Sequence, residues 1–411
     1  MLVLGQNYGI IIKQVWGYYL KQNICLSRIK GSFMNLKRLK LLNFRNYKEL
    51  DLEFSSRINI FIGENGAGKT NILEAIYVLS LTKSNRYGVA TDLIKTDTEE
   101  TSIVGEVEYD NYLKQYQIVI NKFTKKVFIN KQEIKRITDY ISNFCVTAFM
   151  PNDIDIIKGP PSIRRNVLNI QIGELYNHYL KYVNEYNNLL KMRNEYLKRL
   201  SINGNSDLKY LTILNQKMIE ISLKIYYFRY FYLDEINKII STIFKKISGI
   251  QSLKIKYENN LGIEKYDENL IKEQLSNKYK KNLNKEIMQG MTMTGLHRDD
   301  LVFEINEIDA KVYSSEGQQR MIIIAYKIAE LLLFKKIKKE YPVLLLDDVF
   351  SEIDLKKRNN IIKYFKDDIQ VIITTNDILN IDEDLVKKAK IYKVKNGTIK
   401  GGVRNVRRKS N

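Results

Sequence analysis

The sequence has few of the residues that support redox or metal chemistry. Among its 411 residues are two cysteines, Cys25 and Cys145, and two histidines. Two cysteines are too few for a disulfide scaffold or a four-thiolate zinc site, so we expect a reducing, cytoplasmic setting. No stretch approaches the ~18 apolar residues that a membrane-spanning helix needs. Disulfide-rich, zinc-binding and membrane-spanning classes are therefore excluded.

Acidic residues are also in short supply relative to basic ones. The chain carries 67 Lys and Arg against 47 Asp and Glu, a formal net charge of +20. Residues 151–290 hold +8 of this excess, and residues 1–33 and 404–411 hold +4 each. Such a balance favours a polyanionic partner, either nucleic acid or an anionic membrane surface, and says nothing about fold.

The first 33 residues differ from the rest of the chain. They contain no acid, hold the only tryptophan, Trp16, and end just before a second methionine, Met34. Lys13 interrupts the apolar run that a secretory signal would need. The composition favours a mis-called start, with Met34 as the true first residue, over a genuine N-terminal extension.

A phosphate-binding loop follows an apolar, β-branched strand that is predicted over residues 58–62. Its pattern is G-x-x-x-x-G-K-[ST], and a helix is predicted over residues 71–81 behind it. The eight residues are Gly63, Glu64, Asn65, Gly66, Ala67, Gly68, Lys69 and Thr70. Backbone N–H groups and the helix N-terminus favour phosphate here, Lys69 would reach the β and γ phosphates, and Thr70 would bind Mg²⁺. We therefore predict an ATP site.

A second apolar strand, predicted over residues 343–346, ends in two acids, Asp347 and Asp348. In a nucleotide site Asp347 would hold the magnesium, and Asp348 would orient or deprotonate the attacking water. The alternative is that both acids merely cap the turn that follows, at residues 351–354. The phosphate loop elsewhere in the chain favours the nucleotide site.

Two further segments present polar groups in the places where ligands bind. Residues 314–320 are small and polar and open a helix predicted to run to about Lys338, so Ser315, Gly317 and Gln318 could face an anion. An ordinary capped helix with Ser315 as N-cap is the alternative. A strand predicted over residues 369–375 ends in Thr374 and Thr375, and ligands sit at the carboxyl ends of parallel strands.

Taken in order, these motifs resemble the ABC-type ATPases, and within them the RecF family of DNA repair proteins. The resemblance rests on residues 42–47, 294–300, 315–320 and 344–354 and extends over about residues 34–394. It implies an ABC-type ATPase head, an α/β fold in which a mixed sheet is flanked by helices. It also implies slow, DNA-stimulated ATP hydrolysis.

The resemblance further implies how the site is completed. Two heads would enclose ATP, so Ser315, Gly317 and Gln318 of one subunit would contact the γ-phosphate on the other, and Asp354 would lie at that interface. Arg45 resembles an arginine that faces the nucleotide. The implied partners are double- and single-stranded DNA and RecR, with RecO and RecA in the same pathway. The chain has Asp348 where transporters have Glu, and Leu296 where the family has Pro.

Residues 151–290 separate the two halves of the predicted ATPase. Apolar residues at alternating three and four spacings predict two long helices, one through Ile172 to Leu190 and one through Leu211 to Phe228, joined by a loop at residues 202–205. This hairpin is short beside the arms of chromosome-maintenance ATPases. Its basic residues either contact DNA or form a solvated face, and they are Lys191, Arg193, Lys198, Arg199, Lys245, Lys246, Lys254 and Lys256.

The sequence therefore predicts ATPase halves at residues 34–150 and 291–403, a helical insertion at 151–290 and a basic tail at 404–411. The predicted function is ATP-dependent DNA binding in recombinational repair. It would use Mg²⁺, dimerise on DNA with ATP and help to load recombinase at gaps or junctions. The alternatives are a structural chromosome ATPase head and the nucleotide-binding subunit of a transporter. The shortness of the hairpin argues against the first, and Asp348 in place of the transporter Glu argues against the second.

Overall fold

The computed structural model describes residues 33–404 except residues 87, 111, 204–207, 352, 366 and 367. The predictions for residues 1–32, for the tail beyond residue 404 and for residues 204 and 205 of the hairpin loop lie outside the described part of the chain. No helix in that part is long and apolar enough to cross a membrane.

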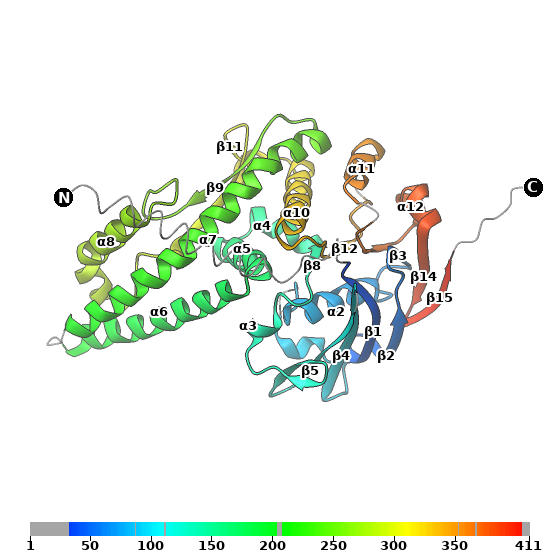
Figure 1. The fold of residues 1–411 in the computed structure, drawn as a ribbon, viewed down its shortest axis with the longest axis horizontal. Coiled ribbons are helices and arrows are strands. Elements are labelled where there is room, and N and C mark those ends of the chain that lie inside the picture. Colours follow the sequence, from blue (N-terminus) through cyan, green and yellow to red (C-terminus); the bar gives the residue numbers. More distant parts are fainter. Residues whose placement is uncertain are drawn as a thin grey trace, which may run out of the picture. The chain divides into compact units, whose positions relative to one another are not determined.

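The centre of the ATPase head is a six-stranded sheet (Figure 1). Its order is β15-β14-β3-β13-β12-β8, and all neighbours except β14 and β15 run parallel. Its strands are β3 (Ile58–Ile62), β8 (Val146–Phe149), β12 (Val343–Asp347), β13 (Val371–Thr375), β14 (Ala389–Lys395) and β15 (Thr398–Arg404). β12 and β13 are buried along their whole length, as expected for parallel strands covered on both faces. The three apolar strands predicted from the sequence are confirmed, with β13 beginning at Val371.

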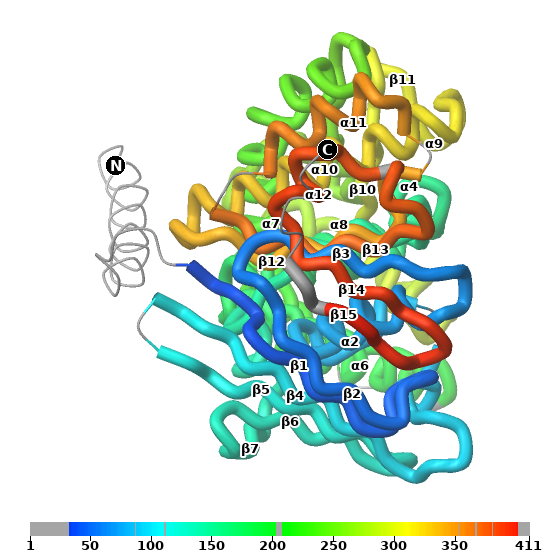
Figure 2. Tube along the Cα trace, turned by 90° about the vertical axis from the view of Figure 1, so that its right-hand side faces the viewer, coloured from blue at the N-terminus to red at the C-terminus, as the bar shows by residue number. Residues whose placement is uncertain are grey.

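A second, antiparallel sheet lies on the other side of the phosphate-loop helix, α2 (Lys69–Leu81). Its order is β2-β1-β4-β5-β6-β7 (Figure 2). The strands are β1 (Asn35–Phe44), β2 (Tyr47–Glu53), β4 (Glu100–Tyr109), β5 (Tyr112–Asn121), β6 (Lys125–Ile129) and β7 (Gln132–Glu133). α2 contacts strands of both sheets and buries most of its residues. A Cβ on Gly105 of β4 would stand 2.2 Å from Leu79 of α2, so glycine permits this close packing.

The rest of the described chain consists of shorter elements and the helices of the insertion. The short helices before the insertion are η1 (Ala90–Leu93) and α3 (Ile137–Tyr140), and the insertion begins with the short helices η2 (Pro151–Ile154) and α4 (Asp155–Lys158). The insertion contains α5 (Pro161–Leu175), α6 (Asn177–Asn203), α7 (Leu208–Ser248), β9 (Leu253–Glu258) and α8 (Glu268–Gln289). After it come η3 (Leu296–Arg298), β10 (Asp300–Ile305), β11 (Ile308–Asp309), α9 (Ala310–Tyr313), α10 (Glu316–Lys338), α11 (Leu355–Ile362), η4 (Ile378–Asn380) and α12 (Glu383–Lys388).

The prediction of one continuous helix through Ile172 and Leu190 was wrong. The chain breaks at Tyr176, whose backbone is extended (φ −135°, ψ 94°), and α6 begins at the next residue. The break lets α6 fold back on α5, because Gly173 has no side chain where Leu180 packs: an added Cβ would lie 2.6 Å from it. The apolar spacing in the sequence continues across Tyr176, so the spacing does not indicate that the helix ends there. The second predicted helix is confirmed as α7.

The residues at 294–300 hold the insertion on the head. Asp300 pairs with Arg164 of α5, with Nε and Oδ1 2.7 Å apart, and buried Asp299 accepts from Tyr257 at 2.6 Å. His297 Nδ1 lies 2.8 Å from the Tyr186 hydroxyl, and burial lowers the pKa of His297 to about 4. A neutral, hydrogen-bonded His297 therefore has the contacts of a structural residue.

Arg193 is the one basic residue of the hairpin list that cannot contact DNA as placed. It is 0% exposed and donates to Glu286 of α8 at 2.6 Å, to Thr292 at 2.8 Å and to Asn215 of α7 at 2.7 Å. Arg193 stands at the three- and four-residue spacing of the apolar stripe, between Leu190 and Leu197, and its partners come from distant segments. The other seven basic residues on that list are exposed.

We predict that Arg193→Met lowers stability more than it lowers DNA binding. The change leaves the buried Glu286 carboxylate without its cation, and breaking such a pair costs about 3–5 kcal/mol. Thermal unfolding followed by circular dichroism should show a clear drop in Tm, whereas Lys191→Met, at an exposed site two residues away, should leave Tm unchanged. Equal unfolding temperatures for the two variants would contradict this role.

Candidate ATP site

The phosphate loop connects β3 to α2 at the carboxyl edge of the parallel sheet. A Cβ on Gly63 would lie 2.3 Å from the Val394 carbonyl of β14, so glycine is needed where the two strands approach. Gly66 (φ +79°) and Gly68 (φ +109°) adopt conformations that favour glycine. Gly68 is the N-cap of α2 and contributes no side-chain cap, so the first amides of the helix remain available to an anion.

The Lys69 side chain curls back over this loop. Its ammonium donates to the carbonyls of Gly63 (2.6 Å) and Glu64 (2.8 Å) and to the Asn376 amide oxygen (2.8 Å). Three acceptors satisfy its three protons. Burial lowers the pKa of Lys69, and the nearby Asp348 and Asp347 carboxylates oppose that shift. The ammonium therefore lies between the phosphate loop and the acids, as the predicted chemistry requires.

The structure joins the phosphate loop to the acidic strand. The Thr70 hydroxyl donates to Asp347 Oδ1 at 2.9 Å, and Thr374 of β13 donates to the same oxygen at 2.6 Å. Burial raises the pKa of Asp347, while these two hydrogen bonds oppose the shift. The second oxygen, Asp347 Oδ2, is buried without a hydrogen-bond partner among the described residues. A hydroxyl and an unsatisfied carboxylate oxygen are ligands that suit Mg²⁺, so the residues fit that ion.

Asp348 leaves the strand in a left-handed conformation, with φ at +53°. Its backbone N–H donates to the Thr374 carbonyl at 3.2 Å, which ties the turn to β13. Neither acid caps α11, whose N-cap is Asp354.

Arg45 is placed differently from its two neighbours. Its guanidinium binds buried Glu74 of α2 through two nitrogens, at 2.6 and 3.1 Å, and donates to the Asp92 carbonyl. Asn46 and Tyr47 instead reach the loop, at the carbonyls of Ala67 (3.3 Å) and Gly68 (3.1 Å). The role of Arg45 at the nucleotide remains a prediction, and the described contacts make it a brace for α2.

Ser315, Gly317 and Gln318 open α10 on the surface. Ser315 is the N-cap of a capping box: Gln318 N–H donates to its hydroxyl at 3.3 Å, and the Gln318 side chain accepts from Ser315 N–H at 2.9 Å. Together with Asp354 and Lys357 they line a hollow of about 220 Å³. The described contacts of these three residues include none with the loop of their own chain. They therefore line a hollow that is separate from the phosphate loop of their own chain.

Three polar residues of the site were not assigned roles from the sequence. Asn376 holds Lys69, Thr374 holds Asp347, and Glu74 holds Arg45. For Asn376 and Thr374 the sequence contains one indication, the polar residues at the carboxyl end of a buried strand, where ligands bind in parallel sheets. Glu74 gave none, because a single acid within a helix is usually exposed.

Comparison with known proteins agrees with this geometry. Residues 35–400 match the family model described as the RecF/RecN/SMC N terminal domain. The DNA replication and repair protein RecF of Oenococcus oeni is 38% identical over 376 residues, covering 90% of this chain and all of the relative. The same protein from Staphylococcus carnosus is 37% identical over 368 residues, covering 89% of this chain and all of the relative.

Solved structures extend the comparison. A structure of the recombination mediator protein RecF with ATP in the RecFOR pathway superposes with a TM-score of 0.84 at 32% identity, covering 91% of this chain and 99% of that one. The Smc head domain of Pyrococcus furiosus shares the fold alone, with a TM-score of 0.52 at 17% identity over 89% of this chain and 95% of that one. The described fold, the matched family model and these relatives together show that the chain belongs to the RecF family of DNA replication and repair proteins.

Proposed function

We propose that this chain is an ATP-dependent DNA-binding protein of recombinational repair and replication restart. It dimerises on DNA while it holds ATP and leaves after slow, DNA-stimulated hydrolysis, and it helps to load recombinase at gaps or junctions. The observation that carries the proposal is the 2.9 Å hydrogen bond between Thr70 and Asp347, which brings the phosphate loop and the acidic strand into one site. RecR, RecO and RecA would act in the same pathway.

Nucleotide binding would use groups that the structure already positions. The Lys69 ammonium exchanges its bond to Asn376 for a phosphate oxygen, while the loop amides and the α2 N-terminus surround the phosphates. Thr70 and Asp347 would hold Mg²⁺, which when bound supplies positive charge against the phosphate oxygens. Thr374 keeps the Asp347 carboxylate in place through its hydroxyl.

Hydrolysis would depend on Asp348. One acid would hold the metal while the other would accept a proton from water. The Asp348 carboxylate opposes the burial-driven lowering of the Lys69 pKa, which supports a position of this acid near Lys69. This division of roles accounts for two adjacent acids at the end of one strand.

Dimerisation would complete the site. The exposed N-terminus of α10 offers the Ser315 hydroxyl and the first amides of a long helix, and its own loop makes no described contact with them. A second copy can present this half-site to the γ-phosphate, so ATP would join the two heads. The half-site would take its anion from the nucleotide that the second copy holds.

We predict that Ser315→Asp abolishes ATP-dependent dimerisation but leaves ATP binding to the monomer unchanged. Aspartate keeps the N-cap of α10, whereas its charge repels the γ-phosphate of the partner. Ser315→Arg, which fills the hollow, should give the same result with a small loss of helix stability. Light scattering and nucleotide titration check both, with Ser201→Asp on α6 as the control. Dimerisation of Ser315→Asp at wild-type ATP concentrations would refute the half-site.

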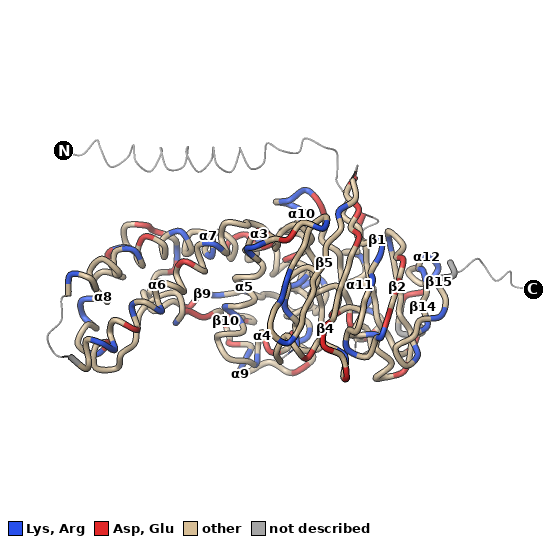
Figure 3. Tube along the Cα trace, turned by 90° about the horizontal axis from the view of Figure 1, so that it is seen from below, with Lys and Arg blue, Asp and Glu red and all other residues tan. Residues whose placement is uncertain are grey.

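DNA would be held by phosphate contacts. Seven basic residues of the hairpin list are exposed, among them Lys198, Arg199, Lys254 and Lys256. Figure 3 shows that Lys and Arg lie along α6, α7 and α8. Each phosphate contact adds a slope of about −0.9 to log affinity against log salt concentration. We predict that Lys198→Gln/Arg199→Gln lowers the magnitude of this salt slope by about 2. The matched variant at the opposite end of the insertion is Lys254→Gln/Lys256→Gln, and its salt slope is measured in the same way. Affinity for duplex DNA that barely changes with salt would exclude this mode of binding.

Different observations argue against the two alternatives, a transporter subunit and a structural chromosome head. The RecF relatives match this chain over their full length, which leaves no observation in favour of a transporter subunit. A structural chromosome head shares the fold, but the described insertion returns to the head through α7 and α8 without a long arm.

A further inference from the structure

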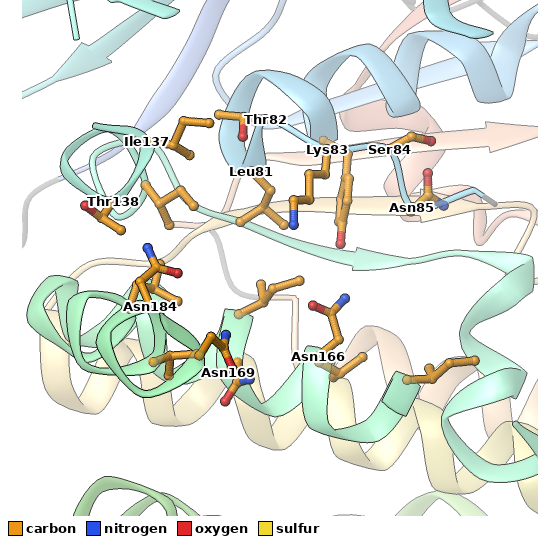
Figure 4. Close-up of a pocket in the computed structure, with 18 of the residues that line it drawn as sticks. Leu81, Thr82, Lys83, Ser84, Asn85, Ile137, Thr138, Asn166, Asn169 and Asn184 are labelled. Carbon is orange, nitrogen blue, oxygen red and sulfur yellow. The ribbon is translucent and has the colours of Figure 1, made fainter. Parts of the chain in front are cut away.

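A wide cleft lies away from the phosphate loop, between the head and the insertion. Its volume is about 1220 Å³, and residues 81–86, Gly88 and α3 form one wall while α5 and α6 form the other (Figure 4). A salt bridge of 2.8 Å between Lys181 of α6 and Asp139 of α3 joins the two walls. The lining includes Ser84 and Arg86, which contact the same Glu74 that holds Arg45, but no residue of the phosphate loop, of the acidic strand or of the Ser315 hollow on α10.

A row of apolar side chains on α5 lines the cleft, separate from the row that α5 packs into the core. α5 already packs inward through Leu168, Ile172 and Leu175. A second row, Ile163, Val167 and Ile170, recurs at the i, i+4, i+7 spacing of one helix face and lines the cleft, only half-buried. Leu180 and Val183 of α6 and the exposed Ile137 of α3 add to it. Such a stripe is suited to aliphatic side chains of a partner.

Polar groups in the same cleft call for hydrogen-bond partners. Thr82 Oγ1 and Asn85 Oδ1 are buried without one among the described residues, and Thr82 is 2% exposed. An amide oxygen such as Asn85 Oδ1 can only accept. The sugar–phosphate backbone of DNA offers acceptors, whereas a peptide backbone offers an N–H at nearly every residue. Exposed Asn166 of α5 and Asn184 of α6 lie on the insertion wall of the cleft (Figure 4), and an amide side chain can pair with both the N–H and the C=O of a peptide.

The charge of the lining favours an acidic occupant. Five lining residues are cationic and three are acidic. Lys83, Lys135 and Arg136 are exposed on the head wall and form no ion pair within the described chain. Cations at the rim of an apolar groove steer a partner of opposite charge.

We propose that this cleft binds an acidic segment of another protein, anchored by aliphatic side chains on the α5 stripe and by its backbone at Thr82 and Asn85. The apolar stripe and the orphaned acceptor favour a peptide over nucleic acid, because nucleic-acid interfaces are more polar and much more positively charged. This inference concerns a partner surface and stands whether or not the proposed function holds.

The test selects ligands without assuming a partner. A random 12-residue peptide library is selected on the full-length protein and counter-selected on Val167→Arg, which blocks the stripe. Enriched peptides are then titrated by fluorescence anisotropy against the wild type, Val167→Arg and Lys135→Glu/Arg136→Glu. Lys122→Glu/Lys126→Glu, also basic residues of the head but outside the lining, is the control, and ATP binding by each variant verifies its fold.

The expected peptides are rich in Asp, Glu and aliphatic residues, and they should lose about tenfold or more in affinity on each cleft variant, as loss of a hot-spot contact does. The control should bind them like the wild type, and oligothymidylate should not compete. Selection that yields no cleft-dependent peptide would overturn the proposal. Peptide binding that Lys135→Glu/Arg136→Glu leaves unchanged would overturn the proposal as well. So would displacement of the peptide by oligothymidylate that the same double substitution abolishes.

Discussion

Replacement of Lys69 by methionine is expected to lower ATP affinity by about 10- to 100-fold, which is the worth of one hydrogen bond to a charged group, about 1.5–3 kcal/mol. Lys69 is 7% exposed, and its ammonium donates to three acceptors at the phosphate loop, which hold it there. Methionine is unbranched and one atom shorter, and it removes the charge. Dimerisation should fail at ATP concentrations that saturate the wild type.

Two comparisons make this result specific. Lys83→Met changes an exposed lysine just beyond the other end of the same helix, α2, and should bind ATP normally. Fluorescent-nucleotide titration gives the affinity, and thermal unfolding shows that Lys69→Met is folded. A Lys69→Met protein that binds ATP and dimerises like the wild type would show that the loop is not the phosphate site.

Asp348→Asn is expected to separate binding from hydrolysis. Asparagine has the shape of aspartate and tolerates the left-handed backbone found here (φ +53°), so the turn should persist. It cannot accept the proton, and loss of a general base lowers the rate by about 10²- to 10⁴-fold. ATP binding and dimerisation should remain, and the dimer should stay on DNA far longer than the wild type does.

The neighbouring acids supply the controls. Asp347→Asn should weaken Mg²⁺-dependent nucleotide binding itself, because Asp347 is the predicted metal ligand. Asp377→Asn lies at the same edge of the sheet, just after β13, where its carboxylate caps η4, and should hydrolyse ATP near the wild-type rate. Phosphate release under single-turnover conditions measures all three. Wild-type turnover by Asp348→Asn would assign the base to another group.

Local sequence was enough for the parts of the site that one strand and the next helix build. Glycines, Lys69 and Thr70 follow a buried strand directly, and Asp347 ends another, so spacing alone placed them at a common edge. The 2.9 Å contact between Thr70 and Asp347 confirms that the two motifs meet. Their 277-residue separation did not matter, because parallel strands fix where carboxyl ends lie.

Partners from distant segments could not be read in the same way. The spacing of Arg193 puts it on the apolar face of its helix, but only α8 reveals that Glu286 lies opposite it. The break at Tyr176 follows from Gly173 and Leu180 packing together, which periodicity does not report. Asn376 gains its role from where Lys69 folds. In each case the deciding contact is tertiary.

The most direct test of the proposed function is the mass of the wild-type protein in solution, measured with Mg²⁺ and ATP, with and without double-stranded DNA, while phosphate release is followed in the same samples. Dimers that form with ATP, that DNA favours, and that turn over ATP faster on DNA are the predicted result. DNA that changes neither dimerisation nor turnover would contradict the account.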